Sequence, residues 1–301
     1  MWFRTGLAAT FLCTLFLLSL SIPCPAQNAT CKDWRFFNKF APADINYWHT
    51  IVGSAQQSNG VITGYIRLFN GSTTTYNAPQ AAPPTNWTFL TRRNANGATV
   101  GWYRDANQIA HGLFLWANKT TTIDATQGET IVYGVNDFGS MVGITGDFSG
   151  GPWDGFKLKK NGTITAISHP NAFLTNPMSI NNGGVIVGWY VKRYDPTPYP
   201  YHGFIFKNNT YWALDYPGSD RTMPNDINNF GVIAGSYQIF ASGNNNGAFG
   251  GFIYANGTFK NIVGPNFMVT GVNGINDGGY IAGVGTNTTT GVGSSFTARC
   301  Q

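Results

Sequence analysis

Short apolar runs alternate with turns rich in asparagine and glycine over most of this chain. The clearest example is SINNGGVIVGWY, residues 179–190, in which an Asn is followed three residues later by a Gly, then by an apolar run and a second Gly. Asn and Gly tolerate positive φ, so the polar cluster predicts a tight turn. The apolar run at residues 185–187 predicts a buried strand directly after that turn.

The same pattern recurs along the chain in six copies. Each Asn precedes its second Gly by seven residues, and successive copies are 48, 42, 45, 47 and 48 residues apart. Self-similarity at such a period is typical of repeat folds. The motif residues are Asn46, Asn94, Asn136, Asn181, Asn228 and Asn276, with Gly53, Gly101, Gly143, Gly188, Gly235 and Gly283.

Two further signals follow each copy of the motif. A small residue opens another apolar run, such as GFIF at 203–206, and five or six residues later comes a hairpin signal such as Asn161-Gly162. Asn-Gly between strand-like runs is a strong hairpin signature, and most repeats then reach a Pro that suits a strand end. Each repeat of about 46 residues therefore predicts four strands, here named a to d in chain order.

Four-stranded units at this period are typical of the blades of a β-propeller. A linear solenoid is the alternative, but its ends would need capping repeats. We favour an all-β, six-bladed propeller, because the sixth repeat stops after its strand c, while residues 35–42 (RFFNKFAP) resemble an unpaired strand d ending at Pro42. This N-terminal strand would complete the last blade and remove an open sheet edge.

Cys31 and Cys300 fall where the turn between strands c and d of the last blade is missing. The other two cysteines, Cys13 and Cys24, lie within residues 1–26, which have the pattern of a cleaved signal peptide. The exported chain then keeps a single Cys pair, which predicts one disulfide, and two free thiols are the alternative. By the loop-entropy model a bridge across so long a loop stabilises the fold by on the order of 5 kcal/mol.

Residues 1–26 have the pattern of a signal peptide. Arg4 supplies a positive charge, residues 7–20 form an apolar core, and Ala26 is a small residue suited to cleavage before Gln27. An uncleaved anchor and a lipoprotein acylated at Cys24 are the alternatives. No later segment is apolar enough to span a membrane. We therefore expect a secreted or periplasmic protein, with residues 27–301 as one monomeric propeller domain that has no membrane association after cleavage.

The repeated phrases also carry a family resemblance. GVNDFGSMVG (134–143), GINDGGYIAG (274–283) and the His202-Gly203-Phe204 triplet resemble the HAF-type extracellular repeats of bacteria. The resemblance covers nearly all of the chain after residue 26, although the first two repeats are degenerate, with His49 in place of the turn Gly and Arg93 before the Asn. It implies export and repeated structure, and no activity or catalytic residues.

The charge of the chain and the motifs that it lacks restrict which ligands and reactions we expect. Net charge is +5 with only 10% charged residues, and the longest basic cluster, Lys157, Lys159 and Lys160, is too small for a nucleic-acid footprint. No metal-ligand spacing, cofactor motif or nucleophile elbow is present, so we predict no metal and no cofactor. His111 and His202 occupy equivalent repeat positions, which favours a hydrogen-bonding role.

The best polar set near the predicted channel is Asp220, Arg221 and Asp226, which flank the inner strand of the fifth repeat. They are candidates for catalysis and for ligand contact, and the sequence favours ligand contact. Because glycosidases generally need two facing carboxylates and acids are scarce here, the sequence favours a protein without enzymatic activity.

The connections between strands b and c carry the clearest candidates for ligand binding. The spacing from the second motif Gly to the small residue of strand c is 11, 11, 12, 15, 16 and 12, so length varies most in repeats three to five. Functional residues prefer such loops on a rigid scaffold. Flat amphipathic rings and one Arg there suit sugars or peptides: Trp153, Arg193, Tyr194, Tyr199 and Tyr201. The alternative is that these residues merely stiffen and cover the loops.

The sequence thus predicts a non-enzymatic binding or interaction module that uses the b–c loops of repeats three to five for a glycan or an extracellular protein. A carbohydrate-active hydrolase or lyase with a site at the channel mouth, and a purely structural extracellular repeat protein, are the alternatives.

Overall fold

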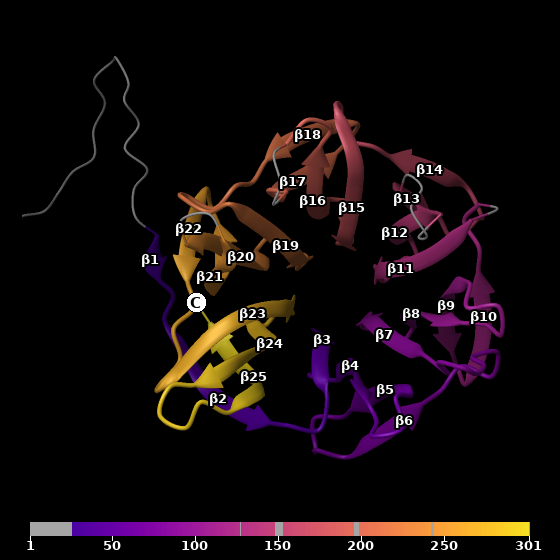
Figure 1. The fold of residues 1–301 in the computed structure, drawn as a ribbon, viewed down its shortest axis with the longest axis horizontal. Helices are drawn as coiled ribbons and strands as arrows, with labels where there is room; N and C mark the ends of the chain where they lie inside the picture. Colours follow the sequence, from indigo (N-terminus) through magenta and orange to yellow (C-terminus); the bar gives the residue numbers. More distant parts are fainter. Residues whose placement is uncertain (1–25, 127, 148–152, 196–198, 242–243, 301) are drawn as a thin grey trace, which may run out of the picture.

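The computed structural model describes residues 26–126, 128–147, 153–195, 199–241 and 244–300. Nearly all of the predicted signal segment, residues 1–25, lies outside them. Every regular element in the described ranges is a β-strand, and no helix there is long and apolar enough to cross a membrane. The sheets stand in a ring around a central axis (Figure 1). This is a β-propeller, as the repeats predicted.

Hydrogen bonds group the described strands into five sheets, in most of which the first strand of a repeat lies nearest the axis. Two sheets of four antiparallel strands come first in the chain: β3 (Ala41–Ile45), β4 (Ile51–Gln56), β5 (Ile62–Arg67) and β6 (Thr73–Tyr76), then β7 (Thr88–Arg93), β8 (Thr99–Arg104), β9 (Ala110–Trp116) and β10 (Lys119–Ile123).

An eight-stranded sheet follows. It contains two antiparallel runs, joined by one parallel pair between Trp153 and Leu174. Its strands are β11 (Glu129–Val135), β12 (Met141–Gly146), β13 (Trp153–Leu158) and β14 (Ile164–Ile167), then β15 (Ala172–Ile180), β16 (Ile186–Lys192), β17 (His202–Lys207) and β18 (Thr210–Ala213).

Two sheets complete the ring, and both include a strand from the N-terminal end. One holds β19 (Arg221–Ile227), β20 (Ile233–Ala241), β21 (Asn244–Ala255) and β22 (Thr258–Asn261), with β1 (Gln27–Asn28) parallel to β22. The other holds β23 (Phe267–Ile275), β24 (Tyr280–Asn287) and β25 (Gly293–Cys300), with β2 (Cys31–Phe37) at its outer edge.

The antiparallel connections put the a–b and c–d turns on one side of the ring and the b–c and d–a connections on the other. We call these sides the turn face and the loop face.

The second Gly of the repeated motif is a packing requirement. A Cβ at Gly143 would lie 2.0 Å from the Ile131 carbonyl oxygen, and one at Gly101 would lie 1.9 Å from the Phe89 carbonyl oxygen. Strand a carries a β-bulge opposite this position, for example between Val132 and Gly134. The bulge brings the strand a backbone so close that glycine alone fits.

The Asn of the motif ties the repeats together. Its Oδ1 accepts backbone N–H groups of its own turn, as Asn136 does from Phe138 at 3.1 Å and from Ser140 at 2.9 Å. Its Nδ2 donates to the carbonyl oxygen of the next repeat's Asn at 2.9–3.1 Å, and Asn276 donates to Asn46 across the junction of the chain ends. The six buried side chains thus form a closed circle of hydrogen bonds.

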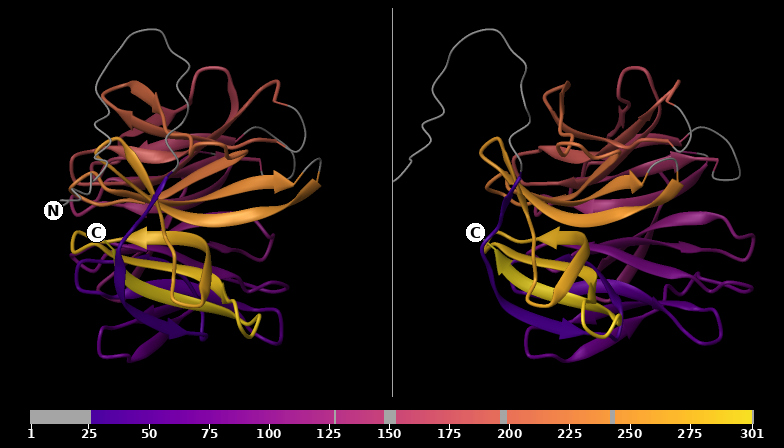
Figure 2. Two further views of the ribbon diagram at one scale, coloured as in Figure 1. Left: turned by 90° about the vertical axis from the view of Figure 1, so that its left-hand side faces the viewer. Right: turned by 60° about the vertical axis from the view of Figure 1, so that its left-hand side comes forward.

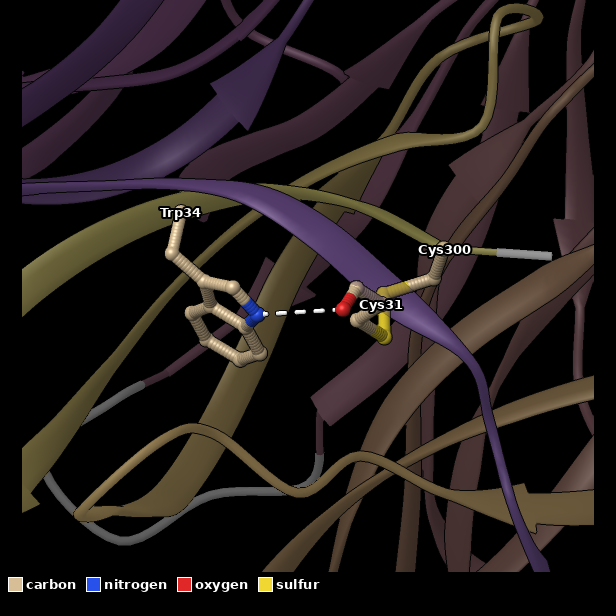
Figure 3. The surroundings of a disulfide bond; sticks show 3 residues. All are labelled: Cys31, Trp34 and Cys300. Carbon is tan, nitrogen blue, oxygen red and sulfur yellow. Dashed lines mark hydrogen bonds between the residues drawn. A yellow bond between two sulfur atoms is a disulfide. The ribbon is translucent and has the colours of Figure 1, made fainter.

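The two ends of the chain meet in the last sheet. Cys31 pairs in register with Cys300, and a disulfide joins them, as the sequence predicted. Both views of Figure 2 show β2 running along the strands of that sheet. Trp34 follows the disulfide, its indole Nε1 donating to the Cys31 carbonyl at 3.4 Å (Figure 3).

The predicted bounds of the N-terminal strand were wrong in one respect. The pairing strand is Cys31–Phe37, whereas Pro42 lies in β3 of the first repeat. Pro42 sits beside the β3 bulge opposite Gly53, so it does not mark the end of a strand d.

Candidate functional site

A buried ion cluster joins the inner strands of the first, second and fifth repeats. The guanidinium of Arg92 on β7 reaches Asp44 on β3 at 3.0 Å and Asp226 on β19 at 2.7 Å. Its Nη2 also donates to the Asn225 carbonyl at 2.9 Å. All three ionic side chains are at most 8% exposed; they line a chamber on the turn face, and Arg92 also lines a chamber on the loop face.

The backbone holds both carboxylates in place. Asp44 accepts the N–H groups of Ile45 at 2.7 Å and Arg93 at 2.8 Å. Asp226 accepts the Ile275 N–H at 2.6 Å and the Ser179 hydroxyl at 2.7 Å. Burial raises the pKa of Asp44 to about 6, with Arg92 opposing this rise and Asp226 adding to it. Both carboxylates therefore bind Arg92 and backbone N–H groups, and Asp226 also accepts the Ser179 hydroxyl.

The three acid–base candidates from the sequence do not converge. Asp226 belongs to the buried cluster. Asp220 lies on the loop face, where its Oδ2 accepts the Phe240 N–H at 2.6 Å. Arg221 also lies on the loop face, at the start of β19. The set is thus divided between the channel and the loop face.

Arg221 is the centre of an aromatic cluster on the loop face. Its guanidinium carbon lies 4.3 Å from the Tyr201 ring centre and 4.9 Å from that of Phe240. Its Nε donates to the Tyr199 carbonyl at 2.9 Å. Tyr201 in turn stacks on Trp189, with ring centres 4.4 Å apart. We call these five residues the Arg221 cluster.

The structure brings together some of the predicted ligand residues. Tyr199 and Tyr201 belong to the Arg221 cluster, and the Tyr199 ring lies 5.7 Å from Phe173. Trp153 on β13 pairs with Leu174, the residue after Phe173, so it borders the same region. Tyr194 is 92% exposed.

Arg193 lies in the same loop after β16, where its backbone N–H donates to the Asn171 carbonyl at 3.1 Å. None of these positions lies in the channel.

A chamber of about 420 Å³ on the loop-face side of Arg92 was not anticipated. Phe89 and Trp102 form one wall, stacked with ring centres 4.2 Å apart, and Tyr133 and Met178 line it as well. Burial raises the pKa of Tyr133 to about 12. The sequence signal would have been two aromatic residues at facing positions of strands a and b, since Phe89 pairs directly with Trp102.

His111 and His202 each lie between two carboxylates. His111 Nδ1 is 2.8 Å from Asp124 and Nε2 is 3.6 Å from Asp105. His202 Nδ1 and Nε2 lie 3.5 and 3.4 Å from Asp215 and Asp195. In each pair the carboxylates contact opposite ring nitrogens, so they do not converge on one point. The described residues contain no group of three or more side chains placed to hold a metal ion.

The fold defines the class of protein as a β-propeller. No protein-family model matches the chain, and no curated protein sequence matches it either.

Several solved structures are similar to this chain in fold. A gluconolactonase from Xanthomonas campestris has a TM-score of 0.50 at 9% identity, covering 93% of this chain and 99% of its own. TolB from Acinetobacter baumannii has a TM-score of 0.48 at 11% identity, covering 84% and 64%. The propeller domain of the Trilobed protease from Pyrococcus furiosus scores 0.46 at 10%, covering 87% and 98%. At these identities the likeness concerns the fold alone.

Proposed function

We propose that this protein is an exported, non-enzymatic binding propeller that holds a glycan or an extracellular protein on its loop face. The binding surface is the Arg221 cluster, carried by the fourth and fifth repeats. The ring has six blades: the eight-stranded sheet holds two four-stranded runs that share one residue pair, and each run carries its own Asn-Gly motif.

The observation that carries the proposal is the fixed guanidinium of Arg221. Two aromatic rings and two hydrogen bonds hold it, the second being from Nη1 to Gln238 at 3.3 Å. In the part of the chain that the structure describes, its Nη2 donates to no protein group. A planar donor held beside aromatic faces suits sugar hydroxyls or peptide carbonyls.

The buried channel argues against the hydrolase or lyase alternative. Asp44 and Asp226 are the carboxylates that meet in the channel, and both bind Arg92. Glycoside cleavage generally needs one carboxyl group that gives up a proton and another that accepts one, both facing the substrate. Both carboxylates line the turn-face chamber, but each is at most 5% exposed and paired with Arg92, so neither is presented to a substrate in this way.

Export has independent support. The Cys31–Cys300 disulfide is typical of an oxidising compartment, and the pattern of residues 1–26 is typical of a signal peptide. The HAF-type resemblance points the same way. We therefore propose a secreted or periplasmic protein.

The test is a glycan and secreted-protein array, followed by calorimetric titration and turnover assays on any hit. Arg221→Ala should weaken binding about ten-fold or more, since the charge-assisted donor is lost. Arg299→Ala is the matched control: Arg299 also lies against a tyrosine, Tyr280, with its Nε donating to the Gly278 carbonyl. Equal affinity of the two variants, or turnover of the hit, would refute the proposal.

A further inference from the structure

An apolar groove lies on the turn face, between the second and third repeats. Its volume is about 710 Å³. The apolar residues that line it come from both repeats: Phe114, Trp116, Ile123, Phe138, Met141 and Leu158. Trp116 and Phe138 are 46% and 67% exposed, so large rings at this groove remain in contact with water. Burying them would be favourable, at about 25 cal/mol per Å² of apolar surface.

The exposed Phe138 is not needed to form its turn. The equivalent position, two residues after the motif Asn, holds Asn96, Gly183 and Gly278 in three other repeats and an aromatic residue in the remaining two, Trp48 and Phe230. The three turns without an aromatic residue show what the turn itself requires. In the Phe138 turn, the Gly139 N–H donates to the Asn136 carbonyl at 3.1 Å. The turns with Asn or Gly make the equivalent hydrogen bond at 3.0–3.1 Å. A phenylalanine at the tip is therefore an addition to the scaffold, and it stands at the side of the groove.

Two lysines give the groove its charge. Lys159 and Lys160 line it, and within the described ranges neither forms an ion pair. The Lys160 stem passes Gly139, 3.5 Å from its ideal Cβ position. One carboxylate, Asp137, also lines the groove, and it accepts the Ala95 N–H at 2.8 Å and the Asn182 Nδ2 at 2.7 Å. The side chains that line the groove thus carry a net positive charge.

We propose that this groove binds a free, single-chain anionic amphiphile. The tail lies on Phe114, Met141 and Leu158 between the rings of Trp116 and Phe138, and the head group pairs with Lys159 and Lys160. An anionic head group is favoured because the ammonium groups of Lys159 and Lys160 form no ion pair within the described residues. Both lysines also lie beside the apolar residues of the groove. A free molecule is favoured over a membrane surface because the site is a concavity between two repeats. The site lies on the opposite face from the Arg221 cluster and does not depend on it.

The test is calorimetric titration of the full exported chain with sodium decanoate below its micelle concentration, compared with decyltrimethylammonium. Decanoate should bind saturably to one site, about ten-fold or more tighter than the cation of equal chain length. The double variant Lys159→Gln/Lys160→Gln should weaken decanoate about ten-fold and leave the cation unaffected or tighter. Lys207→Gln, at the matching turn of the fourth repeat, should change neither.

Phe138→Ser tests the apolar part of the site, and it should weaken both probes. Phe230→Ser is its matched control, since Phe230 occupies the same turn position in the fifth repeat and is 78% exposed. Equal binding of the two probes, or equal loss in both phenylalanine variants, would overturn the proposal. So would binding to phosphatidylglycerol vesicles without saturable binding of decanoate. Arg221→Ala should leave decanoate affinity unchanged, which separates this site from the proposed loop-face function.

Discussion

Individual residues in the channel have roles that follow from burial. Arg92 is paired with two carboxylates that come from distant parts of the chain, and its side chain is only 8% exposed. Removing one partner of such a buried group leaves the other charge uncompensated, which typically costs about 3–5 kcal/mol. The cluster therefore holds the inner strands of repeats one, two and five against each other.

The raised pKa of Asp44 predicts a specific pH dependence. Burial raises this pKa from 3.8 to about 6, so between these values the folded protein keeps a proton that the unfolded chain loses. The Asp44 contribution to the unfolding free energy should therefore fall as pH rises from about 4 to 6, by on the order of 3 kcal/mol, and level off above. Urea unfolding of wild type and Asp44→Asn at several pH values checks this. Parallel curves for the two proteins over that range would contradict it.

At the scale of the strand, the repeated motif forms the a–b turn and also allows the backbones of strands a and b to lie close together. The Asn satisfies the backbone of the a–b turn, and the second Gly lets the bulge of strand a lie against strand b. Each requirement is local to one hairpin, which is why the seven-residue offset is constant while the loops between repeats vary. The same hairpin is also joined to its neighbour through the Asn side chain.

Replacing a motif Gly by Ala should destabilise the protein although the change adds a single methyl group. In Gly143→Ala the new Cβ would lie 2.0 Å from a backbone oxygen, so strand a must shift, at a cost of about 1–3 kcal/mol. Gly293→Ala is the control, because its new Cβ, at the first residue of β25, would meet nothing closer than 3.9 Å. Chemical unfolding midpoints compare the two. A loss as large in Gly293→Ala as in Gly143→Ala would argue against the close-contact explanation.

At the scale of the molecule, the ring is closed by three kinds of contact between the chain ends. β2 pairs with β25, the disulfide joins Cys31 to Cys300, and Asn276 donates to Asn46 at 3.0 Å. The bridged cysteines are 269 residues apart. A covalent link over so long a loop restricts the unfolded chain more than the folded one.

Loss of the disulfide should therefore lower stability without changing the fold. The double variant Cys31→Ser/Cys300→Ser should lose up to on the order of 5 kcal/mol, as measured by chemical unfolding. Far-ultraviolet circular dichroism should stay unchanged, because β2 retains its backbone pairing. Reductant should lower the wild-type unfolding midpoint and leave that of the double variant where it is. An unchanged wild-type midpoint under reduction would show that the link adds nothing.

The features that depend on residues close together in the chain are the ones that the sequence predicts correctly. The motif Asn and Gly each have a requirement within one hairpin, and the Cys pair takes the place of one missing turn, so these features can be identified from the sequence. The predicted bounds of β2 are wrong because a Pro is typical of a strand end, whereas the place of Pro42 beside a bulge depends on pairing with β4.

The ligand-binding candidates show the limit of that reasoning. Residue type alone makes each Tyr and Arg of the long loops a candidate, whereas contact between Arg221, Tyr201 and Phe240 requires three separate segments to meet on one face. The pairing of Arg92 with Asp44 and Asp226, and the groove between the second and third repeats, depend in the same way on neighbours in the ring.

The sequence by itself thus determined the strands, the repeats and the joining of the ends, because strand and turn formation depend on residues close together in the chain. The tertiary structure alone decided which charges meet in the channel, which rings surround Arg221 and where lysines border an apolar groove. Those features arise between repeats, where the distances are set by the curvature of the ring and not by spacing along the chain.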